Sequence, residues 1–135
     1  MKTDIDICID VYRLVNKSAI KDTINGEVSY LPRKDGSTKE DCIISVLESQ
    51  VYQIQDSKIN VNVYVPDQDS NGRKEMAVAR VKALANICKG VFGDGKRSVF
   101  GDGFKITLEK QRILSVNGKD EHVINNTLRY KFNNE

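Results

Sequence analysis

The stretch from Lys39 to Asp67 reads KEDCIISVLESQVYQIQDSKINVNVYVPD and contains the two clearest strand patterns of the chain. Residues 59–65, INVNVYV, alternate branched aliphatic side chains with asparagine and tyrosine, which predicts a strand with one core face and one polar face. Residues 41–47, DCIISVL, carry apolar side chains on both faces and predict a central strand. Pro66 ends the second strand because it cannot donate a ladder hydrogen bond.

Apolar spacings of three and four residues predict two helices, over residues 4–17 and 73–89. Thr3 or Asp4 can cap the first, and Gly90 is placed to end the second. The apolar stripe of the second helix consists of Ala77, Val81, Leu84, Cys88 and Val91. Its basic residues, which we expect to face away from that stripe, are Arg73, Lys74, Arg80, Lys82 and Lys89.

The remaining patterns complete one domain over residues 1–135. A weak strand at 27–31 follows the Asn25-Gly26 turn. Residues 104–108 predict a strand, which residues 113–116 continue past a bulge or restart, and Asn117-Gly118 is a hairpin turn into a last strand at 122–132. The predicted fold class is α+β, with a mixed, mainly antiparallel sheet packed against two helices in the order α-β-β-β-α-β-β.

The composition excludes several classes of protein. With 39% apolar and 30% charged residues in 135, the chain is globular, and its net charge of +2 is too mild to indicate nucleic-acid binding by itself. No apolar run is long enough to span a membrane, so no membrane partner is expected. The three widely spaced cysteines, Cys8, Cys42 and Cys88, are interpreted as buried side chains in a reducing compartment.

Each candidate catalytic or cofactor motif in the sequence lacks a residue that its chemistry requires. Residues 90–97, GVFGDGKR, approach a phosphate-binding loop, but Arg97 stands where a serine or threonine must reach magnesium, and the order helix, loop, strand is wrong. The repeated VFGDG, at 91–95 and 99–103, offers only Asp94 and Asp102 to a cation. Pro66-Asp67 lacks the following Glu-x-Lys of a nuclease, and the lone His122 leaves little room for a nucleophile–histidine pair. We therefore expect no enzyme, no cofactor and no metal site.

A nucleic-acid-binding module is the alternative. The opening order of helix, three strands and helix is shared with double-stranded RNA-binding domains, in which a basic cluster begins the last helix, as Arg73 and Lys74 do here. The binding surface would be the basic face of helix 73–89. The chain departs from that pattern because about 45 residues of strand and loop follow the helix.

Three pieces of sequence carry a resemblance to a known family: Ile24-Asn25-Gly26, residues 39–47 (KEDCIISVL) and residues 59–67 (INVNVYVPD) leading into the helix. In this order they resemble the tail terminator, or tail completion, proteins of long-tailed phages, especially those of Bacteroidetes phages and prophages. The family pattern is an N-terminal helix, an ING turn, a K-E-D strand, a VPD strand, a helix and a closing hairpin.

The resemblance implies a structural virion protein at the tail or neck, assembled in the cytoplasm of a bacterial host. It implies a homo-oligomeric ring, typically a hexamer, that caps the tail tube and joins it to the head. The implied partners are further copies of the chain, the tail tube protein and a neck or head-completion protein, with DNA passing through the pore without specific binding. The residues expected at the interface or pore are Arg33, Lys34, Lys39, Asn60, Asn62, Tyr64, Lys96 and Arg97.

Overall fold

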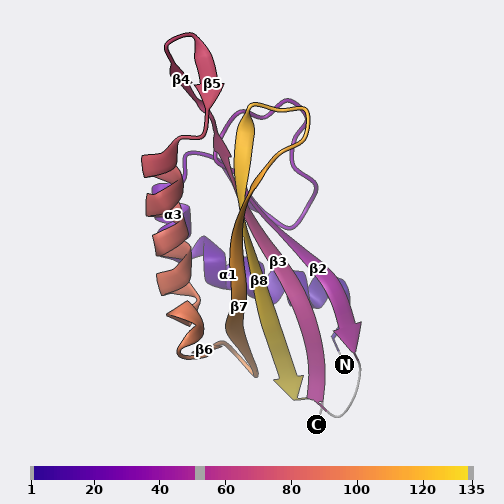
Figure 1. Cartoon of the computed structure of the whole chain (residues 1–135). Helices are drawn as coiled ribbons and strands as arrows, with labels where there is room; N and C mark the ends of the chain where they lie inside the picture. Colours follow the sequence, from indigo (N-terminus) through magenta and orange to yellow (C-terminus); the bar gives the residue numbers. More distant parts are fainter. Residues whose placement is uncertain (1, 51–53, 134–135) are drawn as a thin grey trace.

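The protein forms one curled sheet with helices on one face, in a computed structural model that describes residues 2–50 and 54–133 (Figure 1). In sheet order, the six strands are β1 (Val28–Ser29), β2 (Cys42–Gln50), β3 (Ile54–Pro66), β8 (Glu121–Asn133), β7 (Phe104–Ser115) and β6 (Val99–Phe100). A separate hairpin joins β4 (Gln68–Ser70) to β5 (Arg73–Glu75). The helices are α1 (Asp4–Asn16), α2 (Ala19–Thr23), α3 (Val78–Val91) and the 3-10 turn η1 (Gly93–Gly95). The α+β class and the mainly antiparallel sheet are confirmed.

The centre of the sheet is the long pair β3 and β8, not the strand at 41–47. β3 pairs with β8 without a register shift from Ile54 to Pro66. β2 has β3 on one side but only the two-residue, parallel β1 on the other. Ile43 and Leu47, which suggested a doubly covered strand, are half-buried and exposed respectively. The predicted central position of 41–47 therefore holds only at Cys42 and Ile43, and the rest of β2 has β3 as its one neighbouring strand in the described structure.

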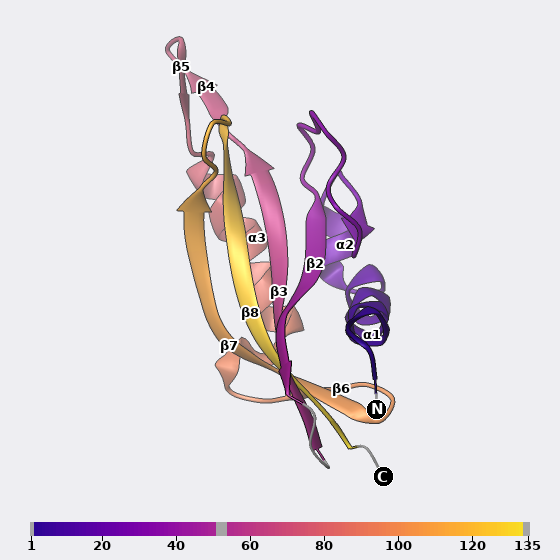
Figure 2. The ribbon, with the colours of Figure 1, turned by 90° about the vertical axis from the view of Figure 1, so that its right-hand side faces the viewer.

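All three α-helices share one hydrophobic core with the inner face of the sheet (Figure 2). α1 begins with a capping box, in which Thr3 Oγ1 accepts from the Asp6 amide at 3.1 Å and the Asp6 carboxylate accepts from the Thr3 amide at 2.9 Å. This confirms Thr3 as the cap. α2, whose cap is Ser18, was not predicted, because five residues are too few to show a helical period.

The second long helix begins five residues later than predicted. Residues 73–75 belong to the β4–β5 hairpin, whose turn residues Asn71 and Gly72 have φ of 53° and 81°. Such a turn closes a two-residue hairpin, which projects beyond the end of the sheet (Figure 1). Gly90 does not end α3 but lies within it, since the helix runs on to Val91.

The C-terminal half follows the sequence pattern closely. The register between β7 and β8 shifts between Leu108 and Lys110, which confirms the predicted bulge. Gly118 has a φ of 74° in the turn that joins these strands. All three cysteines are buried and free. Of the helices in the described part of the chain, none is long and apolar enough to cross a membrane.

Candidate functional surface: the open face of the sheet

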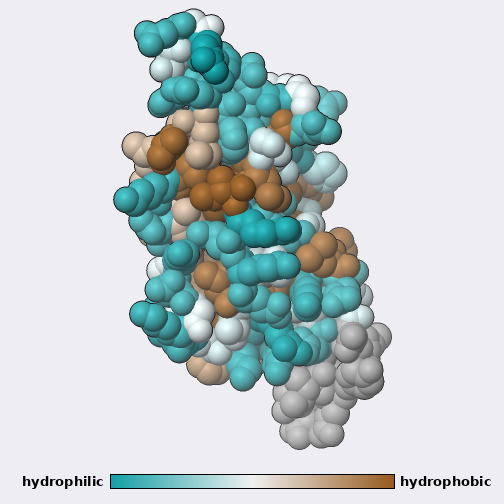
Figure 3. Space-filling model, viewed as in Figure 1, coloured by the Kyte–Doolittle hydropathy of each residue, from teal (hydrophilic) through white to brown (hydrophobic). Residues whose placement is uncertain are grey.

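The sheet has a face that the helices leave uncovered, and we call it the open face. Figures 1 and 3 view the molecule from this side, and the helix α1 lies behind the strands. Because partners in an antiparallel register share a face, the register of β2, β3, β8 and β7 identifies its members. They are Ile43, Ser45, Asp56, Lys58, Asn60, Asn62, Tyr64, Lys105, Thr107, Lys110, Arg112, Leu114, Val123, Asn125, Thr127, Arg129 and Lys131.

A ladder of amide side chains occupies the middle of the open face. Asn125 donates through Nδ2 to Asn60 Oδ1 at 3.1 Å and to Asn62 Oδ1 at 2.6 Å. Asn125 and Thr127 are only 6% and 3% exposed. The sequence correctly predicted a polar face with Asn60 and Asn62. Local alternation could not predict that their partner, Asn125, lies on a neighbouring strand.

Tyr64, at one end of this face, is covered by Arg33. The Arg33 guanidinium carbon lies 4.3 Å from the centre of the Tyr64 ring. The guanidinium also forms ion pairs with Asp41 at 2.8 Å and Glu121 at 2.7 Å. Arg33 and Tyr64 therefore anchor a loop to the sheet, and the Arg33 charge is paired with two carboxylates.

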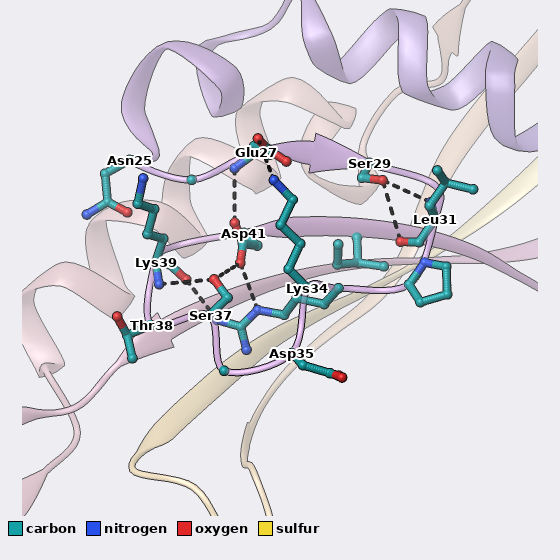
Figure 4. A pocket seen from close by; sticks show the side chains of 15 residues that line it. Asn25, Glu27, Ser29, Leu31, Lys34, Asp35, Ser37, Thr38, Lys39 and Asp41 are labelled. Atoms are coloured by element: carbon teal, nitrogen blue, oxygen red, sulfur yellow. Dashed lines mark hydrogen bonds and ion pairs between the residues drawn. The ribbon is translucent and has the colours of Figure 1, made fainter.

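That loop, residues 30–41, encloses a hollow of about 650 Å³ (Figure 4). Asp41 organises it, because its carboxylate accepts from the Glu27 amide at 3.0 Å, from Ser37 Oγ at 2.5 Å and from Arg33. Burial acts to raise the pKa of Asp41, but the hydrogen bonds from Ser37, Arg33 and the Glu27 amide, together with the Arg33 charge, outweigh it, and the pKa lies below its usual value. The hollow is thus a product of the loop's internal bonding.

The other charged candidates do not form one surface. Lys34 is exposed and pairs with Glu27 at 3.5 Å, and Lys39 is exposed nearby. Lys96 and Arg97 lie after η1, at the opposite end of the sheet beside β6 (Figure 1). The two charged loops, at 33–41 and 96–97, therefore lie apart in the fold.

The basic helix face of the alternative function is also divided. Arg73 and Lys74 lie on β5, outside the helix. Arg80 turns inward and bonds to the Glu40 carboxylate at 2.6 and 2.7 Å and to the Thr23 carbonyl oxygen at 2.8 Å. Lys82 and Lys89 are the lysines that α3 exposes.

A set of cations that sequence reasoning had not grouped lies on the open face instead. Three carboxylates, Glu48, Asp56 and Glu109, lie among six cations, which leaves a local net charge of +3, more than the +2 of the whole chain. The six are Lys58, Lys105, Lys110, Arg112, Arg129 and Lys131. The alternation of cations along 105–112 and 129–131 indicates in the sequence that each strand has a basic face. Only the pairing of β7 with β8 brings these two rows of cations side by side.

The lone histidine lies beside an aspartate just after the end of β3. His122 Nδ1 lies 2.7 Å from Asp67 Oδ1. Ser115 is opposite His122 in the register but makes no hydrogen bond to it. Within the described residues, no group of three or more His, Cys, Asp or Glu side chains is placed to hold a metal ion.

No family model matches this chain, and no curated protein is detectably similar to it in sequence. Its function must therefore be argued from its surfaces together with its short motifs.

Proposed function

We propose that this protein is a structural ring protein of a phage tail or neck, of the tail-terminator kind. The ING turn, the K-E-D strand and the VPD strand, in that order, are the sequence support. In this role, copies of the chain close a ring, typically a hexamer, that caps the tail tube and meets a neck or head-completion protein.

The structural observation that carries the proposal is an apolar area on a free strand edge, which we call the β7 edge patch. β6 pairs with β7 only at Ile106 and Lys105, so residues 107–115 have no strand on their outer side in the described structure. On this edge Ile113, on the helix side of β7, is 45% exposed, and Leu114, on the open face, is 40% exposed, so the patch wraps around the edge. Val78 at the start of α3 is 59% exposed. Figure 3 shows hydrophobic side chains gathered over this part of the molecule.

A patch of this kind suits contact with a second copy. Contiguous apolar surface on a free edge is typically covered by a protein partner. A ring requires a head-to-tail contact, in which the patch meets a different surface of the next copy and the rotation closes. The β4–β5 hairpin, which projects past the sheet, adds reach toward a neighbouring copy or a tail protein (Figure 1).

The first test is self-association. In native mass spectrometry at high protein concentration, the wild-type chain should form a closed oligomer, and Leu114→Lys should shift it toward the monomer. The matched control is Leu31→Lys, since Leu31 is 61% exposed but lies in the loop before Arg33. Equal loss of oligomer in both variants would remove the β7 edge patch from the proposal.

The decisive test is made on virions of the phage or prophage that encodes the chain. Electron cryomicroscopy should place a ring of this protein at the junction between tail and head. Well-resolved virions with no density for the chain at that junction would refute the function.

A further inference from the structure

Two hollows adjoin at the end of the open face where β6 and β7 meet. One, of about 460 Å³, is lined by Phe100, Gly101, Gly103, Phe104, Lys105, Lys131 and Phe132. The other, of about 470 Å³, is lined by Lys58, Lys105, Thr107, Glu109, Arg129 and Lys131. Lys105 and Lys131 line both, so an aromatic hollow and a cationic hollow share one wall.

Phe100 is the exposed aromatic side chain of the aromatic hollow. It is 73% exposed and is the register partner of Lys105, which puts it on the same side of the sheet as that lysine. Its hairpin is held closely, because the Gly101 amide donates to the Phe104 carbonyl oxygen at 2.9 Å. A Cβ at Gly101 would lie 2.1 Å from the Phe104 ring, so only glycine lets the hairpin sit there. The second VFGDG thus presents Phe100 to solvent on a fixed support.

The charges beside Phe100 are arranged for an anion. Lys105 and Lys131 stand directly opposite each other in the register, and like charges in that position destabilise a sheet. Two carboxylates lie near the lysines, and each has another cation as a partner. Asp56, opposite Lys131 in the register, is held by Arg129 at distances from 2.6 to 3.1 Å. Glu109, which lines the cationic hollow, lies 3.8 Å from the Lys58 ammonium. Lys105 has no ion pair in the described residues. An anionic group between the two lysines would relieve their repulsion.

The composition of the surface favours nucleic acid over a protein partner. Lysine is depleted at protein–protein interfaces, whereas this end of the open face carries Lys58, Lys105 and Lys131 together. Proteins that bind single strands combine a cationic track for the backbone with aromatic side chains on which bases stack. The cations continue along β7 through Lys110 to Arg112, which gives a track longer than one nucleotide.

We propose that this end of the open face binds single-stranded nucleic acid. A base stacks on Phe100, its phosphate lies between Lys105 and Lys131, and the neighbouring phosphates follow the cations of β7 and β8. A duplex cannot bind in this way, because its bases are already stacked on one another. The site goes beyond the proposed ring and does not depend on it, since a ring can pass DNA without such a contact.

The test is fluorescence anisotropy with a short labelled oligodeoxynucleotide, as a single strand and as a blunt duplex, over a series of salt concentrations. The single strand should bind more tightly than the duplex. Phe100→Ala should weaken single-strand binding by roughly 5- to 100-fold and leave the salt slope unchanged, because stacking carries no charge. The double variant Lys105→Gln/Lys131→Gln should reduce the magnitude of the logarithmic salt slope by about 0.7, which is the contribution of the one phosphate that lies between the two lysines.

Two matched controls change the charge by the same amount elsewhere. Lys82→Gln/Lys89→Gln on α3 and Arg73→Gln/Lys74→Gln on β5 should leave affinity and slope close to wild type, and circular dichroism should show every variant folded. The proposal is overturned by absence of binding at low salt, by equal binding of duplex and single strand with Phe100→Ala neutral, or by equal effects of the controls. Binding of thymidine monophosphate as tight as that of the oligonucleotide would also overturn it, because the ligand would then be a free nucleotide. The ring proposal is tested separately on virions, and none of these binding results bears on it.

Discussion

At the scale of single residues, Asp41 contributes most to the order of the loop over the sheet. Its carboxylate binds one backbone amide, one hydroxyl and one guanidinium, and it is only 7% exposed. The same guanidinium, that of Arg33, reaches Glu121 at the start of β8. Asp41 thereby links Glu27, just before β1, to the loop and, through Arg33, to the start of β8. The sequence showed it only as the acidic first residue of an expected strand.

Replacing Asp41 with alanine should therefore be costly. The change leaves the Arg33 guanidinium, the Ser37 hydroxyl and the Glu27 amide without their acceptor, and we expect the free energy of unfolding to fall by about 3 kcal/mol. Urea unfolding followed by circular dichroism measures this. Lys34→Ala is the control, because its exposed 3.5 Å pair with Glu27 should be worth less than about 0.5 kcal/mol. Similar losses in the two variants would show that Asp41 does not organise the loop.

At the scale of elements, the two copies of VFGDG show how identical residues take different roles. In the first copy, Val91 ends α3 and Gly93 and Gly95 have positive φ in η1. In the second copy, Val99 begins β6 and Gly101 lies against the Phe104 ring. The elements beside each copy differ. The first copy continues α3, and the second leads into β7, which pairs with β8.

Two glycine-to-alanine changes should shift the free energy of unfolding in opposite directions. Gly101→Ala forces a Cβ into the Phe104 ring, which is stacked on Tyr130, so we expect a loss of about 2 kcal/mol in the free energy of unfolding. Gly90 lies inside α3 with nothing within 4 Å of a new Cβ, so Gly90→Ala should raise stability by about 0.5 kcal/mol. Thermal melts of both variants beside wild type provide the measurement. A neutral Gly101→Ala would mean that the hairpin does not hold Phe100 as described.

At the scale of the whole molecule, buried carboxylates join parts that are distant in the chain. Glu40, buried beside Asp41, binds Arg80 of α3 and accepts from the Asn25 amide at 3.2 Å. The hydrogen bond from Arg80 is the largest cause that lowers the pKa of Glu40, and burial acts against it. Helix layer, turn and sheet are therefore coupled through groups that titrate in acid.

This coupling predicts a loss of stability in acid. Because the folded-state pKa values of Glu40 and Asp41 lie below their unfolded values, both carboxylates stabilise the fold at neutral pH. That contribution should be lost as the pH falls from about 5 through the lowered folded-state values. Urea unfolding at a series of pH values should show this decline, and Glu40→Gln should show a smaller one. Curves for wild type and Glu40→Gln that stay parallel down to low pH would contradict the coupling.

The sequence by itself determined the elements whose residues repeat with a clear period. The strands at 59–65 and 122–132, the bulged strand between 104 and 116, the first helix and the Asn117-Gly118 turn all follow from local pattern, because alternation and turn chemistry act over a few residues. It also determined which side chains are polar on β3.

Only the tertiary structure decided what those polar side chains meet. Asn60 and Asn62 find Asn125 from 63 to 65 residues away, Arg33 finds Glu121 from 88 residues away, and Arg80 turns inward to Glu40. The cationic end of the open face exists because β8 lies between β3 and β7 in register. Strand order and register are set by long-range burial of the apolar faces, and no local period encodes them.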